Sequence, residues 1–298
     1  MQSMHQSFLN IQRYRYALYA GLLGAGCVTS YVVDSWRERP AGNTVLGYTL
    51  GGIAGALVLF LMSYGIRRRS FHARAGATKR WLSMHVYLGM CVLLVATLHS
   101  GLQFGCNVHT LAYGLLCVVV LSGCWGVYAY IRYPTLIARE RGAVSREELL
   151  KRLAETDAQA LAVAAGLDLE VRDLIADAIR RTRLGGTVWA QLRGCDESTL
   201  LLVPIREPGY THLVSNRGQQ ALIAQLAKHQ TTTRESGSQH RLHQLLQISG
   251  DKAVVLRRLQ RDIQIQGLMQ FWLYLHVPLS FGMLAALAVH IFSVFYYR

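Results

Sequence analysis

Residues 81–100 read WLSMHVYLGMCVLLVATLHS and contain no lysine, arginine, aspartate or glutamate. A helix needs about 20 consecutive apolar residues to cross the hydrocarbon core of a bilayer. Four further stretches are uncharged in the same way and are 18 to 30 residues long: 16–33, 44–66, 109–131 and 268–297. The five stretches together predict an all-α transmembrane helix bundle with five spans.

The composition agrees with a membrane protein and disfavours an ordinary soluble enzyme. Of the 298 residues, 52% are hydrophobic and 16% are charged, whereas a soluble domain has about 25% charged residues. Charge is concentrated between the fourth and fifth stretches. We therefore expect transmembrane helices 1–4 in residues 1–134, a cytoplasmic α+β insert in 135–267, and transmembrane helix 5 in 268–298.

The positive charges predict how the chain lies in the membrane. The N-terminal segment and loop 67–80 carry eight lysines and arginines, against three in loop 34–43, loop 101–108 and the C-terminus. Cytoplasmic loops carry the excess of basic residues, so we expect the N-terminus and insert inside and the C-terminus outside. This distribution fits a multi-pass protein of a bacterial inner membrane. This bias also accounts for the net charge of +14, and no nucleic-acid-binding pattern accompanies it.

Within the insert, helix caps and turn residues predict several short elements. Ser145 and Glu148 have the spacing of a capping box, which predicts a helix to about residue 165. Asp168 suits the cap of a second helix to about residue 183, which Gly185 and Gly186 would end. Three β-prone segments predict a small antiparallel sheet: 187–192, 199–205 and 210–214. A helix near 217–228 and a basic helix near 251–266 would follow.

Four histidines lie inside two of the predicted spans. His85 and His99 belong to the third span, His276 and His290 belong to the fifth, and each pair is 14 residues apart. Fourteen residues turn a helix to within about 40° of the starting direction and advance it by about 21 Å. Each pair therefore occupies one helix face, at two depths of the membrane. Lone histidines in spans are usually packing or proton-path residues, but the repeated spacing favours a ligand role.

The topology pairs these histidines across the two helices. Both spans start at the cytoplasmic side, so they run parallel, with His85 level with His276 and His99 level with His290. Two facing imidazoles can hold one haem iron from both sides. We therefore predict two b-type haems, an inner one on His85 and His276 and an outer one on His99 and His290. Zinc is disfavoured because neither level has carboxylate or thiolate companions.

This pattern resembles the di-haem cytochrome b superfamily. The matching segments are WLSMH ending at His85, LH at His99, FWLYLHVP around His276, and VH at His290. Ligands on the third and fifth helices resemble the transmembrane part of the ferric reductase and NADPH oxidase family. The resemblance implies transmembrane electron transfer with these four histidines as axial ligands. The sequence departs from that family because it contains no flavin- or nicotinamide-binding domain, and no quinol-site Pro-Glu-Trp of the eight-helix cytochromes occurs.

The leading hypothesis is an electron-transfer subunit of an oxidoreductase complex rather than a stand-alone enzyme. Its expected partners are other subunits of a membrane electron-transfer complex of the respiratory-chain type and an extracytoplasmic redox protein. Electrons would come from a quinone or a cytoplasmic donor. Two alternatives remain open: a quinone-reactive oxidoreductase subunit with its own quinone pocket, and a non-redox membrane receptor or scaffold. His109, at the start of the fourth span, is a weaker candidate for contact with a quinone or the outer haem.

Overall fold

The computed structural model describes residues 14–37, 41–70, 75–141, 144–202, 212–233 and 235–296. Five of the described helices are long and apolar enough to cross a membrane, which confirms the predicted helical bundle of a multi-pass membrane protein. They are α1 (Arg15–Ser35), α2 (Val45–Ser70), α3 (Ala75–Ser100), α4 (Val108–Arg141) and α9 (Ser236–Tyr296). The helices α2, α3, α4 and α9 extend beyond the uncharged stretches, because polar flanking residues continue the same backbone hydrogen bonding.

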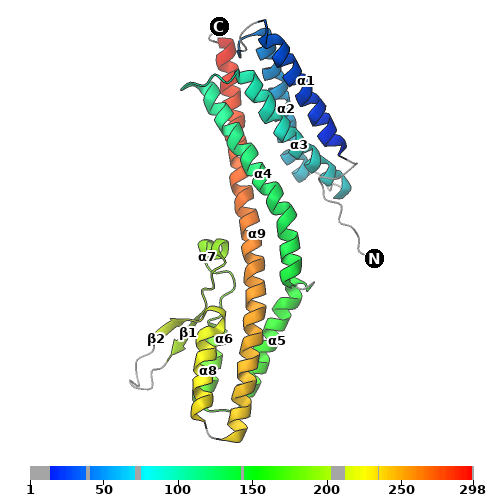
Figure 1. The fold of residues 1–298 in the computed structure, drawn as a ribbon. Coiled ribbons are helices and arrows are strands. Elements are labelled where there is room, and N and C mark those ends of the chain that lie inside the picture. Colours follow the sequence, from blue (N-terminus) through cyan, green and yellow to red (C-terminus); the bar gives the residue numbers. More distant parts are fainter. Residues whose placement is uncertain are drawn as a thin grey trace. The chain divides into compact units, whose positions relative to one another are not determined.

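The chain divides into two compact units. One comprises residues 1–131 and 272–298, and the other comprises 132–271. In the first unit, α1, α2 and α3 pack side by side (Figure 1). Its buried cluster includes Leu50 of α2 and Val92 and Val95 of α3, and it is completed by Leu116 of α4 and Met283 of α9. All five apolar helices therefore contribute to one core.

The outward faces of these helices are strongly apolar. Leu22, Leu59, Leu121 and Phe292 each expose between 60% and 65% of their surface. A soluble domain rarely leaves contiguous apolar patches of this kind uncovered, whereas a helix in lipid faces hydrocarbon tails. The exposed apolar faces therefore agree with a membrane environment.

The second unit is mostly helical. Its elements are α5 (Arg146–Ala164), α6 (Leu169–Arg180), α7 (Val188–Arg193), β1 (Thr199–Leu202), β2 (His212–Ser215), the short 3-10 helix η2 (Arg217–Gln219), α8 (Gln220–Thr232) and the first part of α9. The Ser145 hydroxyl caps α5 by accepting a hydrogen bond from the Glu148 N–H, as expected. Asp168 precedes α6 without a side-chain cap.

The predicted sheet is wrong in one of its three strands. Residues 188–193 form helix α7, whose N-terminus is capped by the Thr187 hydroxyl and whose C-terminus ends at Gly194 in the left-handed conformation. Side-chain capping and a left-handed glycine are local helix signals that outweighed the β propensity of the intervening residues. The described sheet is a two-stranded antiparallel hairpin that pairs Leu200 with Val214. The expected strand residues 203–205 and 210–211 lie outside the described residues.

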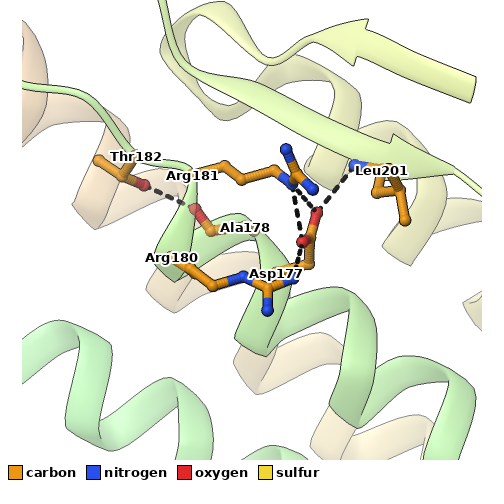
Figure 2. A network of polar contacts seen from close by, with 6 residues as sticks. All are labelled: Asp177, Ala178, Arg180, Arg181, Thr182 and Leu201. Atoms are coloured by element: carbon orange, nitrogen blue, oxygen red, sulfur yellow. Dashed lines mark hydrogen bonds and ion pairs between the residues drawn. The ribbon is translucent and has the colours of Figure 1, made fainter.

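A buried carboxylate connects α6 to the hairpin (Figure 2). Asp177 accepts hydrogen bonds from Arg180 at 2.6 Å, from Arg181 at 2.8 Å, and from the backbone N–H of Leu201 at 2.9 Å. Burial raises the pKa of Asp177, but these hydrogen bonds outweigh burial and the net result is a lowered pKa. The charged carboxylate therefore stabilises the folded insert and orders β1 against α6.

We predict that Asp177→Ala lowers the free energy of unfolding of the insert at neutral pH by about 2 kcal/mol, because the Leu201 N–H and both arginines lose a charged acceptor. Since the pKa of Asp177 is lowered in the folded state, this contribution exists above the unfolded pKa of about 4 and disappears as the pH falls through the folded value. Thermal unfolding followed by circular dichroism at several pH values measures it. The matched control is Asp173→Ala, an exposed carboxylate of the same helix; an equal effect of both variants would contradict the prediction.

Candidate functional site

The four predicted histidines lie on two helices of the membrane unit. His85 and His99 belong to α3, and His276 and His290 belong to α9. All four rings are partly buried. Among the described residues, the backbone of α3 packs along α2 and α1.

At the level predicted to be the outer one, the structure brings His99 and His290 together. Their ring centroids are 6.0 Å apart and their planes are nearly perpendicular, at 89°. His99 Nδ1 lies 2.8 Å from the backbone oxygen of Gly47 in α2. A carbonyl oxygen only accepts hydrogen bonds, so Nδ1 donates and the Nε2 of a neutral His99 ring carries a free lone pair.

A third histidine joins this level. His109, at the start of α4, contacts His290 through the Nδ1 atoms of the two rings. The ring centroids are 4.4 Å apart and the planes are perpendicular. One Nδ1 must donate and the other accept, so the tautomers of the two rings are coupled to each other. Sequence reasoning ranked His109 as a weaker candidate; the signal was its place at the outer start of α4, level with the C-terminal end of α9.

At the inner level, His276 is held by α4. Its Nδ1 lies 2.6 Å from the Ser122 hydroxyl, while the Ser122 backbone oxygen accepts a hydrogen bond of 2.8 Å from the Trp272 indole. The Trp272 and His276 rings lie 5.3 Å apart. Ser122 thus ties one turn of α9 to α4 through both its side chain and its backbone. Sequence reasoning missed Ser122, because a serine in a span has no distinctive spacing.

His85 is anchored differently from the other three histidines. Its Nδ1 is buried and has no hydrogen-bond partner among the described residues. The ring lies 5.2 Å from the Tyr64 ring, and the Leu61 backbone is nearby. His276 lies within electrostatic range of it. Buried polar atoms are normally satisfied, and the Leu61 backbone is a polar group that interacts with this ring.

We tested whether these residues fit a haem. Two metal–imidazole bonds of about 2 Å and two ring radii of about 1 Å place the centroids roughly 6 Å apart, which matches His99 and His290. In the described residues, no group of three or more histidine, cysteine, aspartate or glutamate side chains could hold a metal ion. The histidines would therefore hold iron only if another group supplied the remaining ligands, as a porphyrin does. A Cβ on Gly89, one turn from His85, would meet no atom within 4 Å, which leaves room beside that ring.

We predict that Gly126→Ala disturbs the inner level, because a Cβ at Gly126 would overlap the indole of Trp272. The indole would have to move, which breaks its bond to the Ser122 carbonyl and loosens His276. A thermal unfolding temperature in detergent several degrees below that of the wild type is expected, since overpacking costs about 1–3 kcal/mol. The control is Gly114→Ala, also on α4, where a Cβ would meet nothing within 4 Å. Equal stability of the two variants would contradict the contact.

The histidine geometry is the observation from which a function can be argued. No family model matches this chain, and no curated protein or solved structure matches it either. Three of the four histidines hold Nδ1 against a neighbouring helix, and the facing outer pair has the separation of two imidazoles on one metal.

Proposed function

We propose that this protein is a di-haem b-type cytochrome that carries electrons across a membrane. The inner haem would be held by His85 and His276, and the outer haem by His99 and His290. The observation that carries the proposal is the shared anchoring of Nδ1 in His99, His276 and His290, combined with the 6.0 Å separation of the outer rings. The inner pair is supported by the buried Nδ1 of His85, which has no side-chain partner among the described residues, and by the electrostatic interaction between His85 and His276.

The anchored nitrogens matter because a metal-binding imidazole must present one defined lone pair. When Nδ1–H is held by an acceptor, the tautomer and the ring plane are fixed and Nε2 becomes a better donor to metal. The Gly47 carbonyl does this for His99, and the Ser122 hydroxyl orients His276. The pattern therefore supports ligation over simple packing.

Two protein ligands on each iron direct the chemistry towards electron transfer. A haem held by two of these histidines would supply a one-electron redox couple and would have no open site for substrate. The helices hold the two imidazole rings of each pair at a fixed separation, and the apolar side chains around them keep water away. The 14-residue spacing sets the two levels about 21 Å apart along each helix, so the pair spans much of the hydrocarbon core. An electron that crosses the whole membrane changes energy by about 2.3 kcal/mol for each 100 mV of transmembrane potential.

The proposal extends to partners and membrane. The protein would be a subunit of an oxidoreductase complex in a bacterial inner membrane, with the N-terminus and the 135–267 insert in the cytoplasm. A quinone or a cytoplasmic protein would donate electrons, and an extracytoplasmic redox protein would exchange them at the outer level. The distribution of basic residues supports this orientation.

We predict that purified protein contains about two b-type haems per chain and shows a b-type α band on reduction. His85→Ala or His276→Ala should remove the inner haem and keep the outer one, and His99→Ala or His290→Ala should do the reverse. Pyridine haemochrome assay and redox titration measure both. The control is His243→Ala, an exposed histidine bonded to Gln247. A haem-free protein that is folded would overturn the proposal.

We predict that Gly51→Ala specifically weakens the outer haem. A Cβ at Gly51 would lie 2.8 Å from the His99 ring, so the ring must shift and its bond to the Gly47 carbonyl is strained. Because second-layer partners tune metal affinity by 10–100-fold, we expect about tenfold weaker retention of this haem. The neighbouring Gly52→Ala, where a Cβ meets nothing within 4 Å, should leave it unchanged. Equal loss of both haems in Gly51→Ala would argue against the assigned levels.

A further inference from the structure

Helix α7 of the insert presents an uncovered apolar surface. Val188 and Trp189 are 69% and 68% exposed, and Leu184 of the preceding turn is 36% exposed. We call Leu184, Val188 and Trp189 the α7 patch. Exposed tryptophan is costly in water, and an exposed apolar patch of this kind marks an interaction surface. The inward face of the helix is packed normally, since Ala190 is buried.

The position of α7 indicates what this patch meets. The Gln264 side chain of α9 donates a hydrogen bond of 3.1 Å to the Leu192 carbonyl. One turn later, the Leu192 side chain approaches Gly267. Residue 268 begins the uncharged stretch of α9, and Phe271 is already half exposed. The residues that hold α7 therefore lie within about 6 Å, along the helix axis, of the start of the membrane-spanning segment.

We propose that the α7 patch lies in the headgroup layer of the same membrane that α9 enters. The interfacial layer on each side of the hydrocarbon core is roughly 5–8 Å thick, which is comparable to the distance along α9 between Gln264, where α7 is bonded, and the start of the uncharged stretch. Tryptophan prefers this layer because its ring is apolar and its N–H is polar. The exposed Arg183 and Arg193 flank the patch and match anionic lipid headgroups. The insert is thereby held against the bilayer by a short helix as well as by its connections to α4 and α9.

The test uses the full chain in vesicles of phosphatidylcholine and phosphatidylglycerol. The fluorescence of Trp189 is the difference between the wild type and Trp189→Phe. We expect blue-shifted emission that is quenched roughly twofold by lipids brominated near the carbonyl end of the acyl chains, and less by lipids brominated near the methyl end. Bound haem would quench tryptophan equally in brominated and unbrominated lipid. The ratio of the two emissions therefore measures quenching by the lipid alone.

A matched control places a tryptophan at the opposite end of the insert. Leu169 is 73% exposed at the start of α6. Three residues earlier, the Gly166 carbonyl accepts a hydrogen bond from the Arg241 side chain of α9. Arg241 precedes Gly267 by about 39 Å of helix. In the double variant Trp189→Phe/Leu169→Trp, the emission of the new tryptophan is the difference from Trp189→Phe alone. It should resemble the emission of tryptophan in water and should not be quenched by the brominated lipids. Solvent-like Trp189 emission would overturn the proposal, and so would blue-shifted emission without lipid quenching, which would indicate a protein partner.

Discussion

The structure of the membrane unit depends on one constraint: an imidazole at membrane depth has two polar nitrogens that water cannot satisfy. Each unpaired polar atom in that setting costs several kcal/mol. The chain meets this cost for Nδ1 with groups from neighbouring helices, namely the Gly47 carbonyl, the Ser122 hydroxyl and the His109 ring. These contacts tie α3 to α2 and α9 to α4, so the same bonds that satisfy the histidines also set the helix arrangement around them.

This arrangement explains why small residues surround the histidines. Gly51 gives the His99 ring its place beside α2, and Gly126 gives Trp272 its place beside α4. In lipid, helices associate through close packing and polar contacts rather than through a hydrophobic driving force. Glycine at these positions lets the polar contacts form at normal distances. Close packing of the helices and the orientation of the histidine rings are therefore two consequences of the same residues.

The insert follows the rules of a water-soluble domain. Leucines from α8 and α9 form its core with Ile175 and Leu200, and Asp177 joins α6 to the hairpin by charged hydrogen bonds. Its departure from this pattern is α7, which leaves Val188 and Trp189 uncovered while Leu192 approaches Gly267 of α9. In a domain that adjoins a bilayer, exposed apolar residues of this kind can be covered by lipid.

The sequence by itself determined the five apolar helices, the Ser145 cap and the two-level spacing of the histidines, because hydropathy, capping and helical periodicity are properties of neighbouring residues. It misassigned 187–192 as a strand, because the β-prone residues were weighed without the capping signals of Thr187 and Gly194 at the two ends of the segment. The tertiary structure alone decided the partners of Nδ1 in His99, His276 and His290. Which atom a side chain meets across a helix interface depends on the rotation and offset of both helices, and no spacing within one helix contains that information.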